Sequence, residues 1–148
     1  MSFNKAGIAL VVGGSSGMGL ETAKLLAGNG VEVVIVGRNS KKLELALNGL
    51  RAVGKATSIQ ADLYQREGIQ TLLDFINQEE TTIGYLVNAA GYFSPKPFIE
   101  HTDDDYEIYM GLNKAIFQIS QAVAKNMSSG NVRGGSIVNV GSMWAKQA

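Results

Sequence analysis

Residues 11 to 20, VVGGSSGMGL, place four glycines and two serines between an apolar run and the start of a helical pattern. Gly13, Gly17 and Gly19 follow the spacing G-x-x-x-G-x-G, and the absent Cβ atoms let backbone N–H groups approach a phosphate at a helix N-terminus. Gly13, Ser15 and Gly17 also spell G-x-S-x-G, the turn that presents a nucleophilic serine in α/β-hydrolases. A P-loop is excluded because a leucine, not a lysine, follows the last glycine. The turn therefore predicts either a phosphate site or a nucleophile.

A nucleophile at Ser15 needs a general base. The only histidine of the sequence is His101, which stands in the polar stretch IEHTDDDYE. That setting is typical of a surface residue, and no acid and histidine follow the serine in the required chain order. A serine hydrolase is therefore the least favoured function. The three aspartates at 103–105 suit the first turn of a helix, where carboxylates complement the macrodipole, so we assign no metal.

Short β-branched runs alternate with segments of helical period along the chain. Helices are predicted around 43–50 and 69–76, and a longer one over 103–128 with Thr102 as its N-cap. Strands are predicted at residues 7–12, 31–37, 56–62, 83–90 and 136–141. This order predicts a doubly wound, Rossmann-like α/β fold, with a parallel sheet and helices on both faces. Ligands of such folds bind beyond the carboxyl ends of the strands, where the glycine turn falls.

The composition fits one domain over residues 1–148, with 45% hydrophobic residues and a formal net charge of zero. A neutral chain argues against nucleic acid or an anionic membrane surface as a partner. No apolar run approaches the roughly 20 residues of a membrane span. The absence of cysteine fits a reducing compartment, and we expect a cytoplasmic protein.

Five motifs in order along the chain carry a family resemblance. They are VGGSSGMG at 12–19, ADL at 61–63, NAAG at 88–91, Asn113 in the long helix, and GSIVNVGS at 135–142. Together they resemble the classical short-chain dehydrogenases/reductases over essentially the whole chain. The sequence departs from the family pattern at two positions. Val12 replaces the common threonine before the glycine motif, and Ala89 replaces the second asparagine of N-N-A-G. Each change removes a side-chain hydrogen bond.

The resemblance implies a dinucleotide cofactor and assigns residues to it. The pyrophosphate is expected at the glycine turn, the adenine beside Asp62 and Leu63, and the path to the nicotinamide beside the NAAG motif. A helix cap is the alternative role for Asp62. The residues assigned in this way are Gly13, Ser15, Ser16, Gly17, Met18, Gly19, Asp62, Leu63, Asn88, Ala89, Ala90 and Gly91.

The end of the second strand bears on the choice of cofactor. An acidic residue about 20 positions past the glycines would hold the ribose 2′-OH of NAD, but this chain has Gly37, Arg38 and Asn39 there. Arg38 can form a charge-assisted pair with a 2′-phosphate, and Gly37 leaves space for it. The alternative is an ordinary solvated arginine. We expect NADP as cofactor, with NADPH preferred over NADH.

Two residues are candidates for catalysis. Helical spacing predicts an apolar buried stripe with Asn113 in its middle, formed by Tyr106, Tyr109, Met110, Ile116, Phe117, Val123 and Met127. The resemblance implies that Asn113 anchors a water in a proton relay, a core asparagine being the alternative. It also implies that Ser142 donates a hydrogen bond to a carbonyl or alcohol substrate, a turn serine being the alternative.

The resemblance further implies a Y-x-x-x-K motif on a following helix, whose tyrosine exchanges a proton with the substrate. Tyr92 and Lys96 have that spacing, but Pro95 and Pro97 prevent the helix that would align them. We therefore expect the chain to be truncated before the tyrosine and lysine and inactive alone. The expected assembly is a homodimer or homotetramer. The alternative function is a nucleotide-binding or sensor module without catalysis.

Overall fold

The computed structural model describes residues 7–129 and 135–142. Within these ranges, five parallel strands form one sheet in the order β3-β2-β1-β4-β5. The strands are β1 (Ile8–Val12), β2 (Val33–Gly37), β3 (Ala56–Gln60), β4 (Ile83–Asn88) and β5 (Ser136–Asn139). Each lies inside a predicted strand, which confirms the parallel α/β fold.

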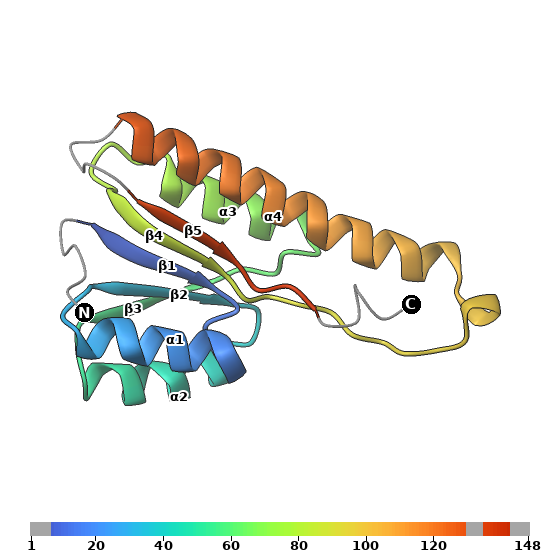
Figure 1. Cartoon of the computed structure of the whole chain (residues 1–148), viewed down its shortest axis with the longest axis horizontal. Coiled ribbons are helices and arrows are strands. Elements are labelled where there is room, and N and C mark those ends of the chain that lie inside the picture. Colours follow the sequence, from blue (N-terminus) through green and yellow to red (C-terminus); the bar gives the residue numbers. More distant parts are fainter. Residues whose placement is uncertain (1–6, 130–134, 143–148) are drawn as a thin grey trace.

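Helices cover both faces of the sheet (Figure 1). The order of the strands reverses direction after β3, so right-handed crossovers place the earlier and later helices on opposite faces. One face carries α1 (Gly17–Gly28) and α2 (Ser40–Arg51), and the other carries α3 (Arg66–Ile76) and α4 (Asp103–Ser129). A single 3-10 turn, η1 (Phe98–Glu100), lies between β4 and α4. No helix of the described ranges is both long and apolar enough to cross a membrane.

The central strand β1 is buried on both faces, as a parallel strand between two helical layers must be. Ala9 and Val11 belong to the apolar cluster under α1 and α2. Leu10 and Val12 point the other way, into the cluster under α3 and α4. The two clusters hold the carboxyl ends of the strands in fixed positions, and the glycine turn follows directly after β1.

The predicted buried stripe on α4 is wrong for Asn113 and for its most exposed aromatic residues. Asn113 is exposed, and its Nδ2 donates to the backbone oxygen of Tyr109 at 3.0 Å. Tyr106 and Phe117 are 59% and 64% exposed. The residues that α4 buries in the core are Leu112, Ala115, Ile119 and Val123, of which only Val123 belongs to the predicted stripe. Ile116 and Met127, also of that stripe, are partly buried against the same cluster.

The difference has a geometric cause. Ala115 is fully buried and brings the helix close to the sheet, which bulky aromatic side chains in its place would prevent. The first turns of α4 also extend beyond the sheet, so nothing from the sheet covers their side chains (Figure 1). Helical spacing identified the helix but rotated its buried face too far toward Tyr106, Met110 and Phe117.

The start of α4 is capped as predicted. Thr102 Oγ1 accepts a hydrogen bond from the backbone N–H of Asp105 at 3.3 Å, and Asp105 Oδ2 accepts from the backbone N–H of Thr102 at 2.8 Å. Lys96 Nζ donates to the same carboxylate oxygen at 2.5 Å. These hydrogen bonds hold the pKa of the Asp105 carboxyl well below its usual range, led by that from Lys96. The Lys96 ammonium is thus used to fix the loop before α4.

Candidate functional site

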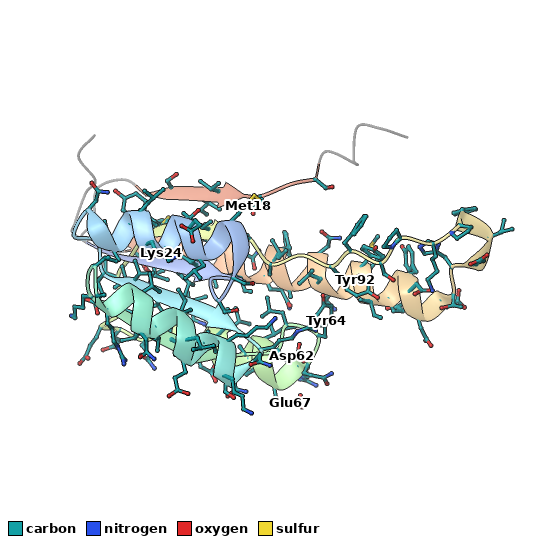
Figure 2. The ribbon with its side chains drawn as sticks, turned by 90° about the horizontal axis from the view of Figure 1, so that it is seen from below. Met18, Lys24, Asp62, Tyr64, Glu67 and Tyr92 are labelled. Carbon is teal, nitrogen blue, oxygen red and sulfur yellow. The ribbon has the colours of Figure 1, made fainter. Side chains whose placement is uncertain are left out.

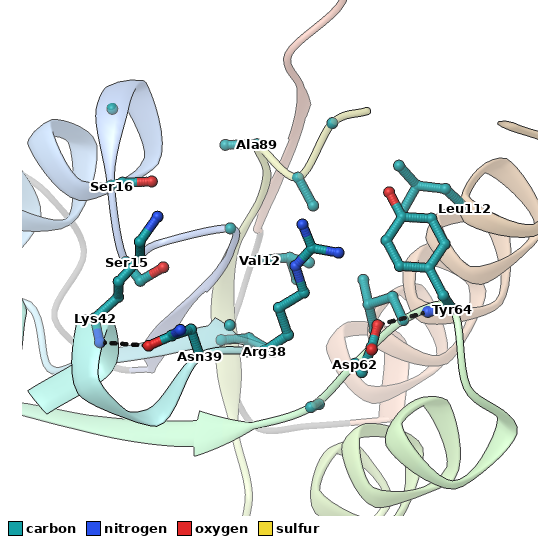
Figure 3. A pocket seen from close by; sticks show the side chains of 18 of the residues that line it. Val12, Ser15, Ser16, Arg38, Asn39, Lys42, Asp62, Tyr64, Ala89 and Leu112 are labelled. Carbon is teal, nitrogen blue, oxygen red and sulfur yellow. Dashed lines mark hydrogen bonds between the residues drawn. The ribbon is translucent and has the colours of Figure 1, made fainter. Parts of the chain in front are cut away.

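A cavity of about 530 Å³ opens at the carboxyl ends of β1 to β4 (Figure 3). This is the edge at which doubly wound folds bind ligands. It brings together most of the residues predicted for the cofactor, namely Gly13, Ser15, Ser16, Gly17, Met18, Gly37, Arg38, Asn39, Asp62, Leu63, Ala89, Ala90 and Gly91. Gly19 and Asn88 are not among the lining residues.

The glycine turn has a backbone that side chains would not tolerate. Gly13 has φ of +82°, and a Cβ at that position would lie 2.6 Å from the backbone nitrogen of Ala90. Gly17 has φ of +56° and opens into free space. Gly19 is buried, and a Cβ there would lie 2.3 Å from the oxygen of Gly13. Gly19 therefore acts by letting α1 pack on the turn.

The N-terminus of α1 is arranged to receive an anion. Its N-cap, Ser16, makes no side-chain cap hydrogen bond, and the first turn holds no acidic residue. By contrast, Asn39 caps α2 by accepting from the backbone N–H of Lys42 at 3.0 Å, and Glu67 stands in the first turn of α3. The first N–H groups of α1, together with the helix dipole, thus face the cavity without a negative partner from the helix itself.

Arg38 extends across the middle of the cavity from the end of β2 (Figure 3). Its backbone oxygen accepts from Gln60 Nε2 at 3.2 Å, which ties the strand end to β3. None of the ion pairs among residues 7–129 and 135–142 involves Arg38. Its guanidinium N–H groups are therefore available to a ligand.

Lys42 also lines the cavity, and the sequence analysis did not select it. Its side chain runs from α2 toward Ser15 and Ser16 (Figure 3). A lysine in the first turn of a helix interacts unfavourably with the helix dipole. This unfavourable position is the sequence feature that could have identified Lys42 as a residue of the site. Arg38 and Lys42 together bring two positive charges to the lining of the cavity.

Asp62 turns the chain between β3 and α3. Its Oδ1 accepts a hydrogen bond from the backbone N–H of Tyr64 at 3.1 Å, which forms an Asx turn (Figure 3). The N-cap of α3 is Gln65, so Asp62 does not cap that helix. Tyr64, also missed from the sequence, lines the cavity with Leu63. Burial raises the pKa of the Tyr64 hydroxyl above its ordinary value and the charge of Arg38 opposes this, so the phenol is neutral near pH 7.

The side chain of Asn88 points into the protein instead of into the cavity. It is 2% exposed, and its Nδ2 donates to Ser120 Oγ at 3.1 Å and to Asn139 Oδ1 at 2.8 Å. Asn88 and Asn139 are also register partners on β4 and β5. The Asn88 side chain thus links β4 to α4 and to β5 by hydrogen bonds.

The two candidates for catalysis lie outside the cavity lining. Ser142 is exposed and follows β5 at the carboxyl edge of the sheet, the same edge as the glycine turn. Asn113 neighbours Leu112, which does line the cavity, but its own amide bonds along the helix. Ser15 faces the cavity, whereas the His101 ring lies by the backbone oxygen of Pro97, 3.1 Å from its Nδ1. The structure gives Ser15 no histidine base.

A sequence model of the family described as short chain dehydrogenase matches residues 7–148. Gluconate 5-dehydrogenase of Gluconobacter oxydans (strain 621H) is 37% identical over 143 residues, which cover 95% of this chain and 55% of that protein. The 2,3-dihydro-2,3-dihydroxybenzoate dehydrogenase of Bacillus subtilis (strain 168) is 34% identical over 137 residues, 91% of this chain and 52% of that one. The chain therefore spans about half the length of the curated relatives it matches.

Solved structures show the same architecture. The short-chain dehydrogenase from Sphingobium yanoikuyae in complex with NADPH has a TM-score of 0.83 and 30% identity, covering 93% of this chain and 54% of that chain. L-sorbose reductase from Gluconobacter frateurii, complexed with NADPH and L-sorbose, has a TM-score of 0.87 and 26% identity, covering 99% and 57%.

Proposed function

Because the chain belongs to the short chain dehydrogenase family, we propose that it forms the cofactor-binding part of an NADP(H)-dependent oxidoreductase acting on a carbonyl or alcohol. The single observation that carries this proposal is the glycine turn leading into the uncapped N-terminus of α1. Those N–H groups suit a pyrophosphate. The cavity beside them reaches from Arg38 to Gly91, which suits an extended dinucleotide.

The preference for NADPH over NADH is supported by the charged residues that line the cavity. Arg38 and Lys42 supply positive charge, and Gly37 ends the strand without a side chain. No acidic residue stands at 37–39 to accept a ribose 2′-OH. The two structural neighbours named above are complexes with NADPH, which agrees with this assignment.

The nicotinamide supplies or accepts the hydride when bound. The residues of this chain bind and orient: the turn and α1 hold the pyrophosphate, and Ala89, Ala90 and Gly91 border the route along the end of β4. Ser142 is proposed to donate a hydrogen bond to the substrate oxygen, where negative charge develops during reduction. Asn113, on α4, is proposed to anchor a water molecule that belongs to a proton relay. The family resemblance assigns the proton transfer itself to a tyrosine on a following helix.

The test uses a protein that carries this chain together with the Y-x-x-x-K helix that the family resemblance implies, which we call the full-length protein. NADPH should bind it in calorimetric titration, and a panel of ketones should give carbonyl-dependent loss of the 340 nm absorbance. Binding of NADPH without turnover of any substrate would favour a nucleotide-binding module without catalysis. Failure to bind either NADPH or NADH would refute the proposal.

The assembly and location of the protein are proposed on the family resemblance. We propose a homodimer or homotetramer in the cytoplasm. Light scattering after size-exclusion chromatography of the full-length protein measures the oligomeric state. Fractionation of cells measures the location. A monomer at micromolar concentration, or recovery with the membrane fraction, would contradict these assignments.

A further inference from the structure

The ring of Tyr64 lies beside the guanidinium of Arg38, and both residues line the cavity. The Arg38 Cζ lies 5.6 Å from the ring centroid, within the range of a cation–π contact. A cation–π contact attracts the charge to the ring without using up hydrogen-bond donors, and no hydrogen bond or ion pair among the described residues uses the Arg38 guanidinium. Because no carboxylate among the described residues pairs with Arg38, the ring is what restrains the charged end of this side chain.

Tyr64 is itself held from two sides. Its backbone is fixed by the hydrogen bond from its N–H to Asp62 Oδ1. Its ring meets the ring of Tyr92 edge-on, with centroids 6.3 Å apart and planes at 73°. Tyr92 in turn meets Tyr109 at 5.0 Å and 72°, and the Tyr109 hydroxyl accepts the backbone N–H of Ser94 at 3.1 Å. A row of three tyrosines thus runs from α4 to the cavity and ends at Arg38 (Figure 2 labels Tyr64 and Tyr92).

We propose that Tyr64 is a positioning residue for cofactor selection, whose ring holds the Arg38 guanidinium so that its N–H edge is presented to the 2′-phosphate of NADPH. The inference rests on the proposed function. An exposed arginine loses rotamer freedom when it binds a ligand, and a side chain that is restrained beforehand loses less. NADH has no 2′-phosphate, so its affinity should not depend on this restraint. Stacking of the ring on adenine is a different role, because both cofactors carry adenine.

The test measures NADPH and NADH dissociation constants for variants of the full-length protein. Tyr64→Leu removes the aromatic face, and it should weaken NADPH by about two- to thirtyfold while NADH changes less than about twofold. Tyr64→Phe keeps the face and should keep the selectivity. Tyr106→Leu, on a 59% exposed tyrosine outside the row, is the matched control and should change neither constant. In an Arg38→Ala background, Tyr64→Leu should have no further effect on NADPH.

Several outcomes would overturn the inference. Equal weakening of NADPH and NADH by Tyr64→Leu would mean that the ring contacts adenosine. If Tyr64→Leu leaves the ratio of the NADPH and NADH dissociation constants unchanged, the ring does not act through Arg38. The same follows if Tyr64→Leu weakens NADPH as much in the Arg38→Ala background as in the unmodified protein. If Tyr64→Leu lowers the melting temperature strongly, Tyr92→Leu serves as the second variant and should reduce NADPH selectivity to a smaller extent. Failure of the unmodified protein to bind either dinucleotide would instead refute the proposed function, before any variant is made.

Discussion

Replacement of Arg38 by aspartate tests the assignment of the cofactor most directly. Arg38 lies in the cavity with no carboxylate partner among the described residues, so its N–H groups are available to a 2′-phosphate. The change removes these donors and places a carboxylate where the ribose 2′-OH of NADH could donate to it. Arg38→Asp should therefore weaken NADPH and strengthen NADH.

The magnitude follows from the setting of the side chain. A charge-assisted hydrogen bond contributes about 1.5–3 kcal/mol, and the exposure of Arg38 places it toward the lower end. A loss of about 1.5–2 kcal/mol corresponds to roughly tenfold to thirtyfold weaker binding of NADPH. One new hydrogen bond to the 2′-OH, at about 1 kcal/mol, corresponds to roughly fivefold tighter binding of NADH. The ratio of the two affinities should therefore change by roughly 50- to 150-fold.

The assay is titration calorimetry of the full-length protein with each cofactor at a fixed salt concentration. Lys41→Asp is the matched control: it makes the same change of charge on an exposed residue next to Lys42, but Lys41 does not line the cavity. Only long-range repulsion should appear in that variant, and salt should screen it. Equal affinities for NADPH and NADH in the unmodified protein, or equal effects of Arg38→Asp and Lys41→Asp, would refute the reasoning.

Three further predictions concern other residues. In the full-length protein, Ser142→Ala should lower kcat by about a hundredfold or more with nearly unchanged cofactor affinity, and a normal kcat would make Ser142 only a turn residue. A serine-directed fluorophosphonate should leave Ser15 unlabelled in mass spectrometry, whereas stoichiometric labelling would restore the hydrolase hypothesis. Asp105→Asn should lower the melting temperature at pH 7. The folded state depresses the pKa of Asp105, so the ionised carboxylate stabilises the fold fully above the unfolded pKa of about 4. This stabilisation is lost as the pH falls, and the melting temperatures of the two proteins should converge in acid.

Local sequence determined the elements of this protein and the kind of turn at its site. Alternating apolar runs and helical periods depend on neighbours within a few positions, so the five strands and the capped start of α4 were predictable. The positive φ at Gly13 and Gly17 is likewise a local property of glycine. The basic residue after the second predicted strand followed from its distance to the glycines, and the structure places Arg38 in the cavity.

The tertiary structure alone decided which side chains meet. Asn88 belongs to a motif expected at the cofactor, but the packing of β5 and α4 turns its amide inward to Ser120 and Asn139. Asn113 lost its predicted burial because α4 turns Leu112 and Ala115 toward the core, and the rotation of a helix about its axis is set by what packs against it. Tyr64 meets Arg38 only because β2 and β3 are adjacent strands whose ends lie at one edge. Such contacts depend on how distant segments are packed, and a spacing rule along one segment cannot determine them.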